Sequence, residues 1–125
     1  MSTTYTIGIV AFDGVLTSEV IGPAEVFSIA SKQEWWQGTR VLLVGVEPQA
    51  MICTDEGIRI AVDATIADDL DLDVLLIPGG NDIDALLRHE GLNAFIQKRI
   101  ELTMFFPTPN STTASSSLKD FPFRT

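Results

Sequence analysis

The chain has 125 residues, of which 46% are hydrophobic and 20% charged, so its length fits one domain and its composition excludes a fully disordered protein. Eight basic and 17 acidic residues give a formal net charge of −9, which argues against nucleic acid as a partner of this part, and no apolar run approaches the roughly 18–20 residues that cross a membrane. The single cysteine, Cys53, excludes an internal disulfide and a multi-cysteine metal site, and without a secretory signal at the N-terminus we expect a reduced, cytoplasmic protein.

The apolar pattern predicts alternating strands and helices over the first hundred residues. In chain order these are a strand at 5–12, a helix at 17–32, a strand at 39–46, a hairpin of 51–54 and 58–62, a strand at 73–78, and helices at 83–89 and 92–102. Continuous apolar runs indicate strands covered on both faces. Thr17 or Ser18 is expected to cap the first helix, and Pro23 favours a helix whose regular part starts near that residue, with 18–22 as an entry segment.

Two segments lack a regular pattern. The acidic stretch from Asp63 to Asp73 has no Gly and terminal Glu at the spacing of a calcium loop, so we expect a solvated connection and no cation site. Residues 103–125 carry nine Ser or Thr and three Pro and predict a loop or disordered tail, in which Met104 to Phe106 extend a short strand at most. The predicted division is an α/β part at 1–102 and a tail at 103–125.

This order of elements is typical of a doubly wound, flavodoxin-like α/β domain with a mainly parallel sheet. Because the pattern stops at the tail, we expect the sheet to be incomplete and to hold only the strands of an amino-terminal half. The carboxyl ends of parallel strands share one edge, where ligands gather. The turns at Asp13-Gly14 and Gly79-Gly80 both follow strands and are therefore placed on the same rim.

Two features of this rim carry candidate chemistry. Gly79 and Gly80 follow an apolar strand and precede a helix, so their amides can face an anion or a developing oxyanion; the alternative is a plain strand-to-helix turn. Glu19 lies just inside the first turn after a strand, where a carboxyl group can be held by burial and form a hydrogen bond with a thiolate or a substrate. The alternative for Glu19 is an acid that favours the helix dipole.

Cys53 and His89 are weaker candidates. Cys53 lies in a short strand before the hairpin turn, with no predicted base or helix N-terminus beside it, which indicates a half-buried structural cysteine. His89 stands alone at a predicted helix end, where it interacts with the C-terminal dipole. Neither residue is predicted to be catalytic, and no cofactor or metal is expected.

Three segments together resemble the ThiJ/PfpI superfamily of class I glutamine-amidotransferase-like domains. They are GIVAFDGVLTSEVIGPAEVF, GIRIAVDATIAD and DVLLIPGGND, and the resemblance runs from about Tyr5 to Ile100. The nearest subgroup holds isonitrile hydratases and the ligand-sensing domains of AraC-family transcription regulators. The resemblance implies that Glu19 is the acid that hydrogen-bonds a nucleophilic cysteine, and that the Gly80 amide, in the PGG motif with Gly79, helps form an oxyanion hole. It also implies a homodimer or self-association, often through the first helix.

The sequence departs from that family at the nucleophile. The family's cysteine lies on a V-C-x-G elbow one βα unit beyond PGG, whereas TMFFPTPNSTT follows Leu102 here and no cysteine follows Cys53. The expected protein is therefore a truncated form of a cysteine-dependent hydrolase or hydratase, without catalytic activity itself. Two alternatives stay open: a non-catalytic small-molecule sensor using the Glu19 and Gly80 rim, and an interaction protein using the open sheet edge. In each case we expect residues 73–78 to leave apolar surface exposed.

Overall fold

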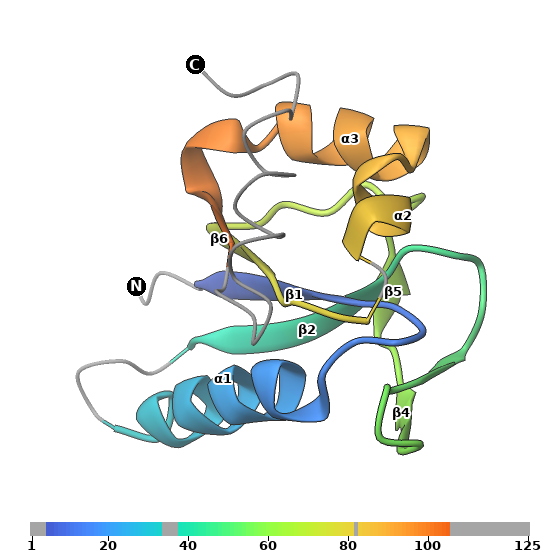
Figure 1. The fold of residues 1–125 in the computed structure, drawn as a ribbon. Coiled ribbons are helices and arrows are strands. Elements are labelled where there is room, and N and C mark those ends of the chain that lie inside the picture. The colour runs from blue at the N-terminus through green and yellow to red at the C-terminus, as the bar shows by residue number, and fades with distance from the viewer. Residues whose placement is uncertain (1–4, 34–37, 82, 106–125) are drawn as a thin grey trace.

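A computed structural model describes residues 5–33, 38–81 and 83–105 of the chain (Figure 1). Its elements, in chain order, are β1 (Thr6–Ala11), α1 (Thr17–Ala30), β2 (Arg40–Gly45), β3 (Met51–Cys53), β4 (Arg59–Ala61), β5 (Ala64–Thr65), β6 (Val74–Ile77), α2 (Ile83–Leu87), α3 (Glu90–Gln97) and β7 (Thr103–Phe105), with a 3-10 helix at Ile100–Leu102. None of the helices in these ranges is long and apolar enough to span a membrane.

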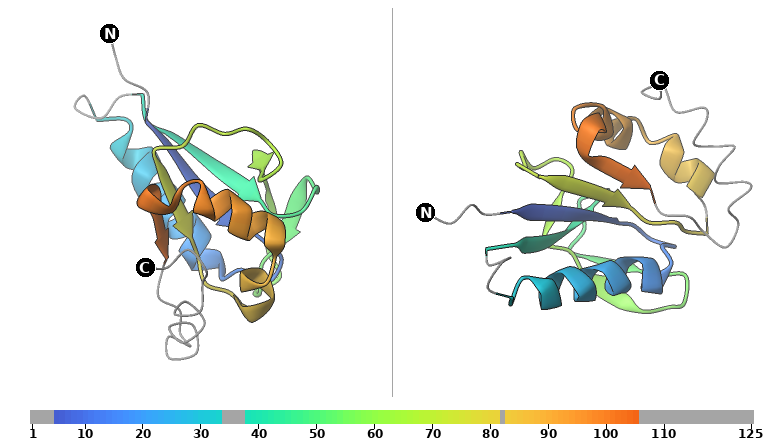
Figure 2. Two further views of the ribbon diagram at one scale, coloured as in Figure 1. Left: turned by 90° about the horizontal axis from the view of Figure 1, so that it is seen from above. Right: turned by 90° about the vertical axis from the view of Figure 1, so that its left-hand side faces the viewer.

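Five parallel strands form the central sheet of the described residues, in the order β5-β2-β1-β6-β7. The chain runs outward from β1 through β2 to β5 and then returns to the other side of β1, so the winding reverses between β1 and β6. Helix α1 lies on one face of the sheet, and α2 and α3 lie on the other (Figure 2). The predicted flavodoxin-like α/β class is confirmed, and β3 and β4 form the predicted antiparallel hairpin.

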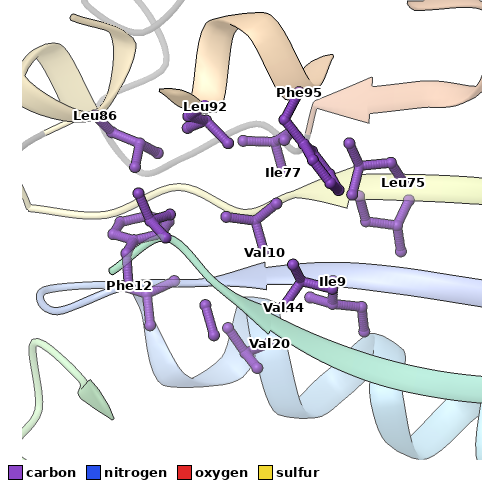
Figure 3. Close-up of a cluster of buried hydrophobic side chains, with 14 of the residues drawn as sticks. Ile9, Val10, Phe12, Val20, Val44, Leu75, Ile77, Leu86, Leu92 and Phe95 are labelled. Carbon is purple, nitrogen blue, oxygen red and sulfur yellow. The ribbon is translucent and has the colours of Figure 1, made fainter. Parts of the chain in front are cut away.

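The core lies on both sides of β1, whose six residues are all buried. Val20 of α1 packs on one side, and Leu86, Leu92 and Phe95 of α2 and α3 pack on the other (Figure 3). This two-sided burial is the physical reason for the unbroken apolar run in the sequence, since a strand covered on both faces has no polar side to alternate.

Strand β6 is nearly as well covered as β1, since three of its four residues are buried. Leu75, Leu76 and Ile77 are 0%, 2% and 1% exposed, so the expectation that this strand would leave apolar surface open is wrong. The large apolar side chains that are exposed lie elsewhere: Tyr5, Ile21, Val26, Ile29, Met51, Ile58, Ile100 and Met104.

Helix α1 begins at the first residue of its predicted range and is regular from there. Its first residue is Thr17, Leu16 is the N-cap without a capping side chain, and Pro23 lies inside the helix. The expected caps from Thr17 or Ser18 and the late start at Pro23 are therefore wrong. The Thr17 N–H is instead satisfied by Glu56 of the hairpin turn, which accepts it at 2.9 Å.

The acidic connection is exposed, as predicted, but it is anchored. Three of its carboxylates accept backbone N–H groups: Asp63 from Leu43, Asp68 from Thr65, and Asp73 from Thr6. Strand β5 also lies within this connection. In the part of the chain that the structure describes, no group of three or more His, Cys, Asp or Glu residues is arranged to hold a metal.

The sheet continues past Leu102. Residues Thr103–Phe105 form β7, which pairs parallel with β6 from Leu75 to Ile77, although the sequence assigned them to the tail. The remainder of the predicted tail, residues 106–125, lies outside the described residues.

Candidate functional site

The loop that joins β1 to α1, residues 13–16, is called the rim loop here, and it lies against the turn after β6. Leu16 N–H donates to the carbonyl oxygen of Gly79 at 3.0 Å, and Asn81 N–H donates to that of Gly14 at 2.9 Å. Val15 and Gly80 form an antiparallel bridge between these two hydrogen bonds. The prediction that the two turns share one rim at the carboxyl ends of β1 and β6 is therefore confirmed.

Glu19 reaches back from the first turn of α1 to the same place. Its Oε1 accepts the N–H of Gly79 at 2.9 Å, although the two residues are 60 positions apart in the sequence. Gly79 is thus bonded at both polar groups, since its carbonyl oxygen accepts from Leu16. The structure brings Glu19 together with the Gly79-Gly80 turn, while the catalytic roles implied by the family resemblance stay predictions.

Gly80 occupies a position with no room for a side chain. A Cβ there would lie 2.6 Å from Cε2 of Phe12 and 3.0 Å from the carbonyl oxygen of Gly14. Real Cβ atoms do not approach neighbours so closely, so the rim requires glycine at this point. Among the described residues no group accepts the Gly80 N–H. A free amide donor therefore lies next to the Gly79 amide that Glu19 holds.

A hollow of about 600 Å³ adjoins Glu19 on the α1 side. It is lined by Leu16, Thr17, Ser18, Glu19, Ile21, Gly22 and Glu56. Its walls combine apolar groups with two carboxylates, which is the composition of many small-molecule sites.

His89 has a structural position that differs from the predicted one. It is the N-cap of α3, where its Nδ1 accepts the N–H of Leu92 at 3.1 Å. An accepting Nδ1 places the ring proton of a neutral histidine on Nε2, which lies 2.9 Å from Oε1 of Glu47. His89 therefore joins the start of α3 to the segment after β2 and does not stabilise a helix C-terminus.

Cys53 carries a free, exposed thiol on β3, so the expected half-buried side chain is wrong. Its backbone is tied to the rim loop, because its N–H donates to Oδ1 of Asp13 at 2.8 Å and its carbonyl oxygen accepts from Gly14 at 2.9 Å. The carboxyl group of Glu19 has the Gly79 amide as its partner, and Cys53 itself lies on a strand of the hairpin.

Sequence reasoning missed Asp13 and Glu56. Asp13 links the rim loop to Cys53, and Glu56 Oε1 accepts both the N–H and the hydroxyl of Thr17, at 2.9 and 2.6 Å. The hydroxyl of Thr17, followed by its N–H, lowers the pKa of Glu56. The only local signal was the acidic turn of a hairpin, which does not reveal that the hairpin docks on a loop forty residues earlier.

An open parallel sheet that reverses its winding beside a glycine turn defines the doubly wound class of α/β folds, whose ligand sites, where a protein has one, lie at the carboxyl ends of the strands. Within that class, the family model of the DJ-1/PfpI family matches residues 5–104, and the chain belongs to this family. No curated protein shows significant similarity to the chain.

Solved structures with the same fold agree with the family. The match to DJ-1beta of Drosophila melanogaster has a TM-score of 0.73 at 16% identity. It covers 92% of this chain and 60% of the DJ-1beta chain. The match to a two-domain protein of Anabaena variabilis, with DJ-1/ThiJ/PfpI-like and ferritin-like domains, has a TM-score of 0.70 at 20% identity. It covers 88% of this chain and 31% of that protein. The match to a ThiJ/PfpI family protein of Pseudomonas syringae has a TM-score of 0.66 at 24% identity. It covers 78% of this chain and 38% of that protein. The chain thus spans less than two thirds of each of these proteins, and the likeness shows the fold.

Proposed function

We propose that this chain is a small-molecule-binding module whose ligand lies at the rim formed by Glu19 and the Gly79-Gly80 turn, and that it performs no cysteine-based catalysis. The observation that carries the proposal is the 2.9 Å hydrogen bond from Gly79 N–H to Glu19, beside a free Gly80 N–H. The rim also lies where the winding of the sheet reverses, which is the usual ligand edge of such folds.

The rim offers one donor and one acceptor. The Gly80 N–H donates, and the carboxylate of Glu19 keeps acceptor capacity beyond the one hydrogen bond it makes, since a carboxylate has about four lone-pair sites. A small primary amide matches both, because its carbonyl oxygen accepts and its NH₂ group donates. We therefore assign small amides as the ligand class, with acetamide as the probe.

The position of Cys53 supports the non-catalytic part of the proposal. In the family that the sequence resembles, the nucleophilic thiol is paired with the acid that Glu19 matches. Here Glu19 accepts the Gly79 N–H, and Cys53, the one cysteine of the sequence, lies on β3 of the hairpin opposite Arg59. In this proposal Glu19 acts as a hydrogen-bonding group for the ligand.

Titration with acetamide, followed by ¹H–¹⁵N NMR, tests the proposal. We expect saturable shifts of the Gly79 and Gly80 amides, and an affinity that falls about tenfold or more in Glu19→Ala, the loss of roughly one charge-assisted hydrogen bond. Glu25→Ala removes the same charge from the exposed face of α1 and should leave the affinity unchanged. Shifts confined to other regions would refute the rim site. A hydrolytic turnover of isonitriles or amides that Cys53→Ala abolishes would refute the non-catalytic assignment.

We also propose a narrower placement: the isonitrile hydratase and AraC-regulator sensor subgroup, of which this chain supplies the amino-terminal part. The GP-x-EVF and D-x-LLIPGG segments support the subgroup. The partial coverage of the solved structures supports the proposal that this chain is only the amino-terminal part of such a protein. Genomic DNA read in all three frames across and beyond codons 100–125 tests it. A V-C-x-G elbow in another frame is expected, and its absence would contradict the truncation.

We propose that two copies associate through the outer face of α1. Ile21, Val26 and Ile29 are 43%, 61% and 54% exposed there, beside the exposed Glu25, and large apolar side chains that gather on one exposed face often mark a contact surface. Light scattering should give a dimer mass that Val26→Glu reduces to that of a monomer. Ile100→Glu, at another exposed apolar residue, should leave the dimer intact. A monomeric wild-type protein would contradict the proposal.

A further inference from the structure

The β3–β4 hairpin is fastened to the rim loop by backbone groups. Asp55 N–H donates to the carbonyl oxygen of Val15 at 2.9 Å, and Gly14 N–H donates to that of Cys53 at the same distance. Figure 1 shows the hairpin standing beside the loop that enters α1. The hairpin is therefore docked whether or not its turn carries a particular side chain.

From this docked position Glu56 reaches the first residue of α1. A single oxygen, Oε1, accepts the N–H of Thr17 at 2.9 Å and its hydroxyl at 2.6 Å. The helix has no capping side chain of its own, because Leu16 is its N-cap. Glu56 thus supplies from another element the acceptor that a Ser, Thr or Asp normally supplies locally.

Thr17 lies between the two residues that hold Gly79. Leu16, on one side, donates its N–H to the Gly79 carbonyl oxygen, and Glu19, on the other, accepts the Gly79 N–H. Glu19 N–H in turn donates to the Leu16 carbonyl oxygen at 3.1 Å, which closes this first turn. The orientation of Glu19 consequently depends on how firmly Thr17 is fixed.

We infer that Glu56 is a positioning residue for the rim: its carboxylate fixes Thr17 and so holds the Glu19 carboxyl group against the Gly79 amide. The lowered pKa of Glu56 agrees with a carboxylate that is charged and bound at neutral pH. The geometric part stands alone, and its consequence for ligand binding rests on the proposed function.

The Gly79 amide is the readout, because it reports the Glu19 hydrogen bond directly. In Glu56→Ala we expect the Gly79 amide resonance to move toward its position in Glu19→Ala, and its hydrogen exchange to accelerate about tenfold or more. The Gly14 and Asp55 amides, which dock the hairpin, should keep their shifts. Glu56→Gln retains an acceptor and should restore most of the Gly79 shift. Glu25→Ala, with the same charge change on the same helix, should have no effect.

If Glu56 has a purely structural role, Glu56→Ala lowers the melting temperature but leaves the Gly79 amide resonance of the folded protein unchanged. That result would overturn the inference. If Glu56→Ala does not fold, Thr17→Val takes its place, because it replaces only the hydroxyl with a methyl group. An unchanged Gly79 amide resonance in Thr17→Val would then contradict the inference. Coupling is tested by combining Thr17→Val with Glu56→Ala: the two effects on Gly79 should not add, because they remove one shared contact.

Acetamide separates this inference from the proposed function. If acetamide fails to bind the wild-type protein, the ligand proposal fails while the Gly79 response to Glu56→Ala still decides the positioning role. If acetamide binds and Glu56→Ala changes neither the affinity nor the Gly79 amide, only the positioning role fails. An affinity that falls in Glu56→Ala together with a moved Gly79 amide, both recovering in Glu56→Gln, supports both; because Glu56 also lines the hollow, a fall in affinity without a moved Gly79 amide contradicts the positioning role.

Discussion

Gly80 and Gly22 predict different outcomes for the same substitution. A Cβ on Gly80 meets Phe12 at 2.6 Å, whereas a Cβ on Gly22, inside α1, has only its chain neighbour Pro23 to meet. We expect Gly80→Ala to lower the free energy of unfolding by about 1–3 kcal/mol through overpacking. Gly22→Ala should change it by less than about 1 kcal/mol, because the clash of a Cβ with the following proline ring opposes the gain in helix propensity. Urea unfolding of both variants checks this, and a Gly80→Ala protein as stable as wild type would contradict the close packing of the rim.

The carboxyl group of Glu56 gives a pH prediction with a definite sign. Its pKa in the folded protein lies below its ordinary value of 4.5, first because of the Thr17 hydroxyl and then because of the Thr17 N–H. A depressed folded pKa stabilises the protein above the unfolded pKa, and this contribution is lost as the pH falls through the folded value. We expect Glu56→Gln to lose less stability than wild type between neutral and acidic pH. Parallel curves for Glu56→Gln and the wild-type protein would refute the assignment.

The parts of the site that depend on sheet topology could be predicted from the sequence. Glu19 and Gly79 each follow a parallel strand, and such strands end at one rim, so their proximity needs no long-range information beyond the fold class. Asp13 and Glu56 were missed because each forms its hydrogen bonds between the hairpin and the start of α1 or the loop before it, and nothing local specifies where a two-stranded hairpin docks. The cap of α1 was expected at Thr17 or Ser18 for the same reason.

At the scale of elements, long apolar runs were predicted well and short strands were not. The runs that became β1, β2 and β6 are continuous, and β1 and β6 are almost entirely buried, which leaves little ambiguity. Strand β5 has two residues and β7 has three, too few for a periodic pattern. Both are held by pairing with longer neighbours, β2 and β6, and such pairing is a property of the sheet and not of the segment.

The aspartates at the two ends of the acidic connection, Asp63 and Asp73, accept backbone N–H groups at β2 and β1 with their carboxylates. Asp73 accepts the Thr6 N–H through Oδ2 and donates its own N–H to the Thr6 carbonyl oxygen, both at 2.8 Å. We expect Asp73→Ala to destabilise the entry into β1 and β6 by about 1–2 kcal/mol, the usual contribution of a hydrogen bond to a charged group near the surface. Asp71→Ala, an exposed neighbour, should change stability by less than about 0.5 kcal/mol. Equal effects of the two substitutions in chemical unfolding would contradict the anchoring role.

For the whole molecule, the important question is where its apolar surface remains exposed. The sequence placed it on the strand at 73–78, because strands beyond it were expected to be missing, yet β6 is buried on both faces. Helix α1 covers its own face of the sheet and still presents Ile21, Val26 and Ile29 to solvent. An apolar surface of this kind on a helix marks a contact surface more often than a fault in packing.

The proposed self-association through α1 predicts a stability that depends on protein concentration. If folding and pairing are coupled, mass action stabilises the folded chain by up to about 1.4 kcal/mol per dimer for each tenfold rise in concentration, which raises the melting temperature by roughly a few degrees in a domain of this size. Calorimetry over a hundredfold range of concentration should show this rise in wild type and lose it in Val26→Glu, because the buried carboxylate opposes pairing without entering the core. Ile100→Glu should retain the rise. If the melting temperature of the wild-type protein does not depend on concentration, the proposed pairing of two copies through the outer face of α1 is contradicted.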